Sequence, residues 1–258
     1  MCIRDSDDTN ASINPNIYEV ADGVDNNCNN DIDEGYEGLD YPVDVDDNTY
    51  NFAIYGSQLW TVENAEMVTY RDGTPIPEVT DQTEWLNLTT GAWCYFDNDP
   101  TKERLYNWYA VMGIHDTDPN TPNKEFAPEG WHLPSDEEWT TLQNHLIGNG
   151  YNYDGTTEGN KIAKAMASTT GWGNNTVDGA PGNNQSINNS SGFNALPVGW
   201  RNLAQFSPEG EINGYWSSND DGVNNSVNLW FIASNTENLN QYDGTSKYWG
   251  FSVRFVKD

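Results

Sequence analysis

Residues 130–139 read Gly-Trp-His-Leu-Pro-Ser-Asp-Glu-Glu-Trp, and this stretch gives the clearest local structural signal in the chain. Ser135 is a good helix N-cap, and Glu138, three residues later, completes a capping box. Acidic residues in the first turn suit the positive end of the helix dipole. The stretch therefore predicts a strand end followed by a capped helix. Three apolar residues then recur on one helix face at i, i+3 and i+7: Trp139, Leu142 and Leu146.

The composition limits the possible partners. The 258 residues include 11 Lys and Arg against 40 Asp and Glu, a formal net charge of −29. Such a surface repels nucleic-acid phosphates and anionic lipids, so we expect no nucleic-acid partner and no membrane insertion. It favours cations that prefer oxygen ligands. The chain also has 11 Trp, 14 Tyr and 8 Phe, aromatic residues that can form a hydrophobic core and that are scarce in disordered chains.

Neither the cysteines nor the start of the chain define a fold. Cys2, Cys28 and Cys94 are widely spaced and form no C-x-x-C pair. No run of 18 apolar residues predicts a membrane span. Residues 1–6 resemble translated adapter sequence, so we exclude them from fold reasoning. We expect an N-terminal truncation, and the lack of an export signal then says little about location.

Residues 1–40 differ from the rest of the chain. They hold eleven acidic residues and one basic residue, with almost no apolar periodicity. A segment of this composition cannot pack a core by itself, so either it is disordered or an ion organises it. We expect two regions: an acidic segment at 1–40 and a main body at 41–258.

Oxygen-bearing side chains alternate along residues 25–33, at loop positions 1, 3, 5, 7 and 9, as in EF-hand-type loops that wrap Ca²⁺. Ile32 at position 8 is expected to point inward. Tyr36 replaces the usual bidentate Glu at position 12, so Glu34 or Glu37 would substitute. We predict Ca²⁺ binding; the alternative is a solvated acidic linker. The candidate metal ligands are Asp7, Asp22, Asp25, Asn27, Asn29, Asp31, Asp33 and Glu34.

The main body alternates apolar runs with polar loops. Period-2 alternation predicts strands at 50–54 and 58–62. Leu105, Trp108, Tyr109 and Met112 at i, i+3, i+4 and i+7 predict an amphipathic helix over 104–112. We expect an irregular loop at 71–91 and a short helix at 160–168. Four short strands are expected between polar loops further on: 192–201, 214–218, 228–232 and 250–256, the last inserted in a sheet as a terminal strand.

Six ordered blocks within residues 41–258 closely resemble the Fibrobacter succinogenes major paralogous (FISUMP) domain. They are GAWCY at 91–95, RLYNW at 104–108, GWHLPSDEEW at 130–139, GFNALP at 192–197, YWSS at 215–218 and GFSVR at 250–254. That family is similar to the formylglycine-generating-enzyme branch of the C-type-lectin-like fold. The resemblance implies an α+β, loop-rich domain with two or three helices and short antiparallel strands, exported to the bacterial surface or medium.

Residues 7–16 and 19–28 resemble the MopE-type metal-binding repeat of secreted bacterial proteins. Members of that family often carry Cys at the places that Ser6 and Ala21 occupy here. The resemblance therefore implies that Cys28 lacks its usual partner, and that metal holds this loop without a disulfide.

The sequence offers little that points to catalysis. The oxidase branch of the wider fold uses paired cysteines near the C-terminus, where Phe255 stands in this chain. The histidines show no H-E-x-x-H spacing, and no G-x-S-x-G motif is present. We interpret His132 as a strand-end histidine without a catalytic partner, and Glu137 and Glu138 as helix-capping residues. A polysaccharide-active enzyme or its accessory domain is the alternative.

Asn residues alternate with Tyr and Trp through residues 213–249. Amides offer hydrogen-bond donors and acceptors, and aromatic rings offer a stacking surface. The segment resembles the variable binding cassettes of lectin-like proteins diversified by retroelements. We predict a non-catalytic adhesion module that recognises a glycan or a surface protein; alternatively, the aromatics fill the core. The candidate ligand-binding residues are Asn213, Tyr215, Trp216, Asn219, Asp220, Asn224, Asn225, Asn228, Trp230, Asn235, Asn238, Asn240, Tyr242 and Tyr248.

Overall fold

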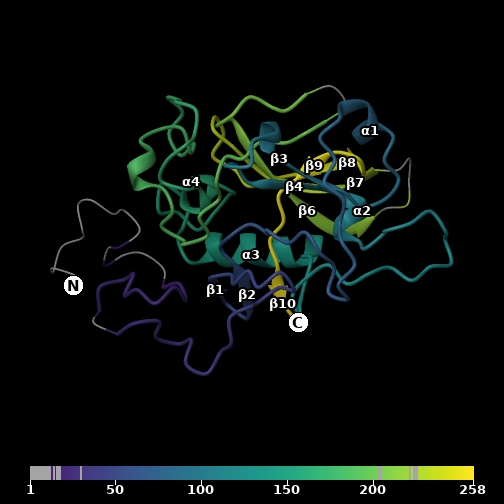
Figure 1. Ribbon diagram of the computed structural model, residues 1–258. Helices are drawn as coiled ribbons and strands as arrows, with labels where there is room; N and C mark the ends of the chain where they lie inside the picture. The colour runs from purple at the N-terminus through teal and green to yellow at the C-terminus, as the bar shows by residue number, and fades with distance from the viewer. Residues whose placement is uncertain are drawn as a thin grey trace.

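A computed structural model describes residues 13, 15, 19–29, 31–202, 205–220, 222 and 226–258. This part of the chain is a mixed α+β structure with few helices and short antiparallel sheets (Figure 1). None of the helices in these residues has the length and apolarity to cross a bilayer. The α-helices are α1 (Gln82–Leu86), α2 (Trp108–Val111), α3 (Asp136–Gly148) and α4 (Ala163–Met166), with 3₁₀ turns at Phe96–Asn98 and Gln185–Ile187.

The strands form three small sheets. The first has the order β1 (Phe52–Tyr55), β2 (Gln58–Thr61), β10 (Val256–Lys257) and β5 (Trp131–His132). The second consists of β3 (Trp93–Tyr95), β4 (Arg104–Asn107) and β9 (Gly250–Phe251). The third consists of β6 (Ile212–Asp220), β7 (Ser226–Ala233) and β8 (Asn240–Ser246).

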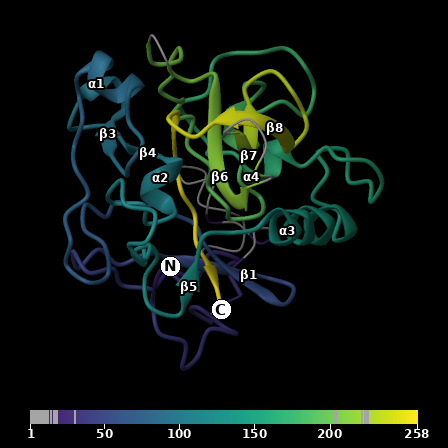
Figure 2. The same cartoon turned by 90° about the vertical axis from the view of Figure 1, so that its right-hand side faces the viewer.

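The C-terminal segment joins two of these sheets. Val256 of β10 pairs with Trp60 on one side and His132 on the other, so β10 lies between β2 and β5. A few residues earlier, β9 is the edge of the second sheet. Figure 2 shows this yellow segment running through the middle of the molecule. The prediction of a terminal strand over 250–256 is confirmed in part: β10 is inserted in the first sheet, but residues 252–255 are not strand, and β9 belongs to the second sheet.

The stretch at 130–139 has the predicted structure. Ser135 caps α3: its Oγ accepts from the Glu138 backbone N–H at 3.3 Å, and the Glu138 carboxylate accepts from the Ser135 N–H at 2.8 Å. The apolar helix face is fully buried, with Trp139 packed against Trp60. Figures 1 and 2 place α3 between the first and third sheets, and residues of α3 contact both β1 and β6.

Three local predictions are wrong. Residues 104–107 form β4 rather than the first turn of a helix, because they pair with β3, and α2 begins only after Asn107 caps it. The expected loop at 71–91 contains α1, which Asp81 caps. Residues 192–201 form isolated bridges instead of a strand.

Candidate functional site

Short polar side chains build the acidic N-terminal loop. The Asn29 N–H donates to Asp25 Oδ1 and to Asn27 Oδ1, each at 3.1 Å. The Asp31 N–H donates to Asn29 Oδ1 at 2.8 Å. Such Asx bonds fold the backbone tightly without a hydrophobic core. The loop is therefore held by the same oxygen atoms that the sequence marks as candidate metal ligands.

Glu34 lies where these side chains meet. Its Oε1 accepts from the side-chain amides of Asn27, at 2.6 Å, and Asn29. Its Oε2 is buried and has no hydrogen-bond partner among the described residues. A buried carboxylate oxygen without a partner is costly, and a cation would compensate it. This orphaned atom, in a site of hard oxygen donors, fits a hard cation held by Asp25, Asn27, Asn29 and Glu34.

The charge around this loop is strongly negative. Burial raises the pKa of Glu19 above its usual range, and the charges of Glu34 and Asp25 add to that rise. Backbone hydrogen bonds from Asn26 and Asn27 act in the opposite direction. A cation at Glu34 would relieve the repulsion between these carboxylates.

The other candidate metal ligands lie apart from Glu34 or cannot be placed. Asp33 accepts from the backbone N–H groups of Asp22 and Gly23 at 3.1–3.2 Å, so Asp22 and Asp33 form a second group. Asp31 is exposed. Asp7 lies outside the described residues. Within the described ranges, no group of three or more His, Cys, Asp or Glu side chains is placed to hold a metal ion, and the Glu34 group depends on Asn oxygens.

The expectation that Ile32 points inward is wrong: its side chain is 63 % exposed. Tyr36 takes the inward place and is 7 % exposed. Its hydroxyl donates to the Glu19 carbonyl at 2.7 Å and accepts from the Ile54 N–H at 3.1 Å. Its ring packs edge-on against Phe52 of β1 at 5.3 Å. The acidic segment is thus anchored to the first sheet through an aromatic residue.

Four of the predicted ligand-binding residues have core positions. Asn213, Tyr215 and Trp216 of β6 are fully buried, and Trp230 of β7 is nearly so. The Trp216 indole N–H donates to the Tyr106 carbonyl at 2.7 Å, and the Asn213 amide donates to the Tyr215 hydroxyl at 2.8 Å. Their side chains are unavailable to a ligand in solution, which corrects their assignment to a binding face.

Other members of the predicted set hold elements together. Asn228 and Trp230 both donate to the carboxylate of Asp136, and Asn219 accepts from its backbone N–H at 2.8 Å. Asp220 accepts from Lys247 at 2.6 Å. The contacts with Asp136 fix the third sheet against the start of α3, and the Asp220–Lys247 pair joins β6 to the turn after β8.

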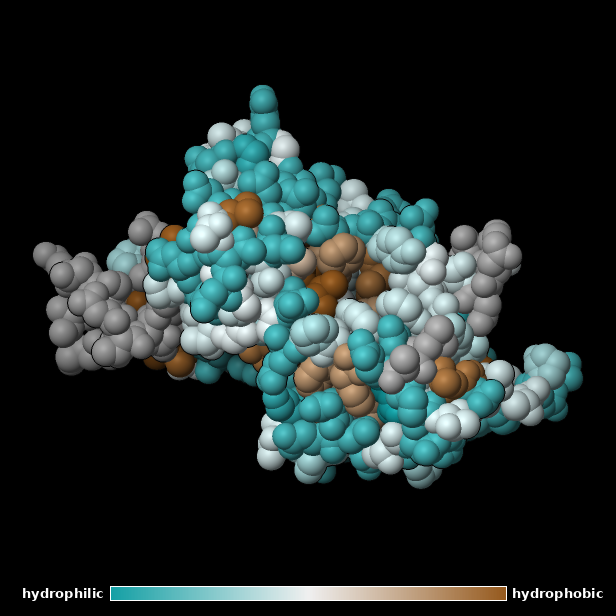
Figure 3. Space-filling view, turned by 90° about the horizontal axis from the view of Figure 1, so that it is seen from above, coloured by the Kyte–Doolittle hydropathy of each residue, from teal (hydrophilic) through white to brown (hydrophobic). Residues whose placement is uncertain are grey.

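The rest of the predicted set lies around β8, which the sequence did not predict as a strand. Tyr242 is 53 % exposed, and Asn235 is also exposed. Asn238, Asn240 and Tyr248 are half-buried. Figure 3 shows a largely hydrophilic face from above, with hydrophobic residues in a hollow near its centre. Asn224 and Asn225 lie outside the described residues.

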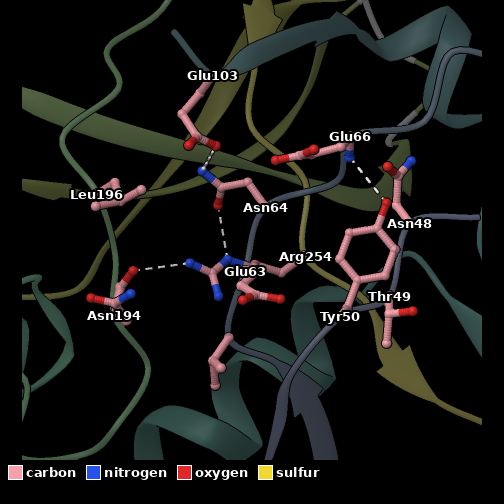
Figure 4. A pocket seen from close by; sticks show the side chains of 11 residues that line it. Asn48, Thr49, Tyr50, Glu63, Asn64, Glu66, Glu103, Asn194, Leu196 and Arg254 are labelled. Carbon is pink, nitrogen blue, oxygen red and sulfur yellow. Dashed lines mark hydrogen bonds between the residues drawn. The ribbon is translucent and has the colours of Figure 1, made fainter. Parts of the chain in front are cut away.

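A polar cavity of about 400 Å³ lies elsewhere, and no sequence motif points to it (Figure 4). Its charged lining consists of Glu63, Glu66 and Glu103 together with Arg254. The amide side chain of Asn64 joins two of these groups: Oδ1 accepts from Arg254 Nε at 2.9 Å, and Nδ2 donates to Glu103 at 3.1 Å. Burial raises the pKa of Glu103, although the Asn64 bond and the Arg254 charge oppose the rise.

Two family models match separate parts of the chain. A family model of a predicted metal-binding motif of the MopE type matches residues 5–34, which include the Glu34 loop. The comparisons with curated proteins and with solved structures give no match. The model of the Fibrobacter succinogenes major domain matches residues 54–257, well over half of the chain. The chain therefore belongs to the Fibrobacter succinogenes major domain family.

Proposed function

We propose that this protein is an exported, non-catalytic binding module of the bacterial surface or medium that recognises a glycan or a surface protein. The observation that carries the proposal is the exposed edge strand β8. Tyr242 on this strand is the most exposed aromatic side chain among the described residues, and Gln241 and Asp243 beside it are exposed as well. An exposed ring flanked by polar groups is suited to stack on a sugar and to hydrogen-bond its hydroxyls.

In the same proposal, the N-terminal segment binds a Ca²⁺ ion. The orphaned Oε2 of Glu34 and the oxygen-rich loop around it support this assignment. Bound Ca²⁺ supplies positive charge that offsets the clustered carboxylates. Because Tyr36 fixes the segment to β1, an ordered loop adds a stable acidic surface to the module instead of a mobile tail.

We also propose that residues 41–258 have a C-type-lectin-like fold of the formylglycine-generating-enzyme branch. The few helices, the short antiparallel sheets and the long connections between them support it. Such an architecture leaves loops and sheet edges free to vary while α3 and the three sheets hold the body.

A glycan array with the full chain, in Ca²⁺ and in EDTA, tests the proposal. We expect the chain to bind at least one glycan on the array without hydrolysing it. Tyr242→Ala should lower the affinity for that glycan roughly tenfold, as for an aromatic anchor at a binding surface. Tyr153→Ala is the matched control, because Tyr153 is 42 % exposed but lies outside the third sheet. Hydrolysis of any glycan would contradict a non-catalytic role. Equal affinities of the Tyr242→Ala and Tyr153→Ala variants would show that β8 is not part of the binding site.

A further inference from the structure

The polar cavity has the size of a small-molecule site. Its volume of about 400 Å³ falls within the range of ligand clefts in proteins. Its walls come from the segment around β1 and β2, from the residue before β4, and from Arg254 near the C-terminus. Neither Tyr242 nor the Glu34 loop contributes to it, so the cavity is independent of the function proposed above.

Acidic side chains dominate the cavity. Figure 4 shows Glu63, Glu66 and Glu103 on different sides of the space, against the single guanidinium of Arg254. Glu63 is fixed in place, because its two oxygens accept from the backbone and side-chain N–H groups of Asn51 at 2.8 and 3.0 Å. Carboxylates spread around a cavity suit an organic cation that has some length.

Arg104 pairs with Glu66 at 3.6 Å, but among the described residues Arg254 forms no ion pair with Glu63 or Glu103. The Arg254 guanidinium is 1 % exposed and donates to neutral oxygens only, those of Thr61, Asn64 and Asn194 at 2.9–3.1 Å. Within the described ranges, Glu103 forms no ion pair within 4.0 Å. Its carboxylate accepts one side-chain hydrogen bond, from Asn64. Glu103 is thus a half-buried carboxylate that has an amide partner but, among the described residues, no direct ion pair.

Neutral polar groups complete the cavity. The side-chain amide of Asn194 forms no hydrogen bond with another described residue, although its backbone carbonyl accepts from Arg254. The hydroxyl of Thr49 and the amide of Asn48 also line the space. Amides and hydroxyls both donate and accept, which is how proteins recognise the hydroxyl groups of sugars. The ring of Tyr50 and the side chain of Leu196 provide apolar contact.

We propose that this cavity binds a small polyhydroxylated primary amine, an amino sugar in its protonated form. The ammonium group pairs with Glu103, and Glu63 adds negative charge. The sugar hydroxyls bind the amides of Asn194 and Asn48. Asn64 positions Glu103 and bonds to Arg254 on its other side, so the carboxylate forms no direct ion pair with Arg254 and stays available to the ligand.

Isothermal titration calorimetry on the full chain tests this site with D-glucosamine, below the pKa of its amine. D-Glucose, N-acetyl-D-glucosamine and an aliphatic diamine are the comparison ligands. We expect heat from D-glucosamine, and affinities at least tenfold weaker for the two uncharged sugars and for the diamine, which lack the charge or the hydroxyls. No heat from D-glucosamine, or equal binding of any comparison ligand, would overturn the proposal.

Variants then locate the binding. Glu103→Gln keeps an acceptor for Asn64 but removes the charge, and we expect it to weaken D-glucosamine binding tenfold or more. Asn194→Gly removes the amide while tolerating the positive φ of 54° at this position, and should weaken binding several-fold. Glu129→Gln on the exposed surface is the control for the charge change. Unchanged affinity in both cavity variants, with native circular dichroism, would place the ligand elsewhere.

Discussion

Asp136 and Trp230 connect the start of α3 to the third sheet. The Asp136 Oδ1 accepts the indole N–H of Trp230 at 2.8 Å, while the Trp230 ring stacks on Trp139 at 5.9 Å with an interplanar angle of 14°. Asn228 donates to the other oxygen of the same carboxylate. The first turn of the helix thus has two roles: its acidic residues suit the helix dipole, and one of them fixes the partner sheet.

The first prediction concerns this contact. Asp136→Ala leaves the buried indole N–H of Trp230 without an acceptor, so we expect the free energy of unfolding to fall by about 1–3 kcal/mol. Glu137→Ala removes a neighbouring exposed charge from the same helix turn and should cost about 0.5 kcal/mol or less. Urea unfolding of both variants measures the difference. Equal losses of unfolding free energy in the two variants would mean that Asp136 stabilises the fold through the helix dipole and not through its contact with Trp230.

The second prediction concerns pH. His132 lies between two carboxylates, with Nε2 2.8 Å from Glu138 and Nδ1 2.6 Å from Asp258. The hydrogen bond with Glu138 is the largest cause that raises the His132 pKa above 6.5. Burial alone would raise the pKa of Glu138, but its bonds with His132 and Ser135 hold it at about 2.

The two pKa shifts affect stability in different pH ranges. The raised pKa of His132 stabilises the fold below pH 6.5, and this stability is lost as the pH rises through the folded pKa. The lowered pKa of Glu138 stabilises the fold above pH 4.5, and that stability is lost as the pH falls toward 2. We therefore expect the stability advantage of the native chain over His132→Gln to shrink above pH 6.5. Thermal unfolding of both proteins across this range measures it; a difference independent of pH would contradict the assignment.

The third prediction concerns the metal loop. Calorimetry with Ca²⁺ on the full chain should show binding, and Glu34→Gln should weaken it by tenfold or more because it removes the charge at the orphaned oxygen. Asp40→Asn removes an exposed charge nearby and serves as the control. No heat at millimolar Ca²⁺ would rule out a Ca²⁺ loop in this segment.

The fourth prediction concerns the anchor of the acidic segment. Tyr36→Phe keeps the ring on Phe52 but removes the hydroxyl that bonds to Glu19 and Ile54, so the loss should be about 1–3 kcal/mol. Limited proteolysis should then cut the segment before residue 40 faster than in the native chain. Tyr153→Phe is the control, since it removes the hydroxyl of a 42 % exposed tyrosine outside the acidic segment. Equal cleavage of the two variants would show that the hydroxyl of Tyr36 is dispensable.

Local signals explain which parts of the fold could be predicted. The capping box of Ser135 and the spacing of Trp139, Leu142 and Leu146 lie within one helix, so the sequence was sufficient for α3. Leu105 and Trp108 have helical spacing too, yet residues 104–107 pair with β3 and β9. Pairing with β3, eight residues earlier, and with the distant β9 overrides the local helical periodicity of this segment.

The candidate sites were harder to predict for a related reason. Asn213, Tyr215 and Trp216 suggested a binding face, but β6 is buried over 213–217 on both of its faces, so alternation could not separate inside from outside. The cavity combines side chains from residues near 50, 64, 103, 194 and 254. Only the folded chain brings them together. The Glu34 loop was predictable because its residues are nearly consecutive.

The position of β10 has a consequence for how the chain folds. Its neighbours in the first sheet come from residues 58–61 and 131–132, so the sheet closes only when residues 256–257 return across most of the chain. Contacts between such distant segments slow folding, because the loop between them must be ordered before the pairing stabilises it. Synthesis must pass residue 257 before the first sheet can close. A chain that stopped before residue 250 would leave two of the three sheets with open edges, exposed to aggregation.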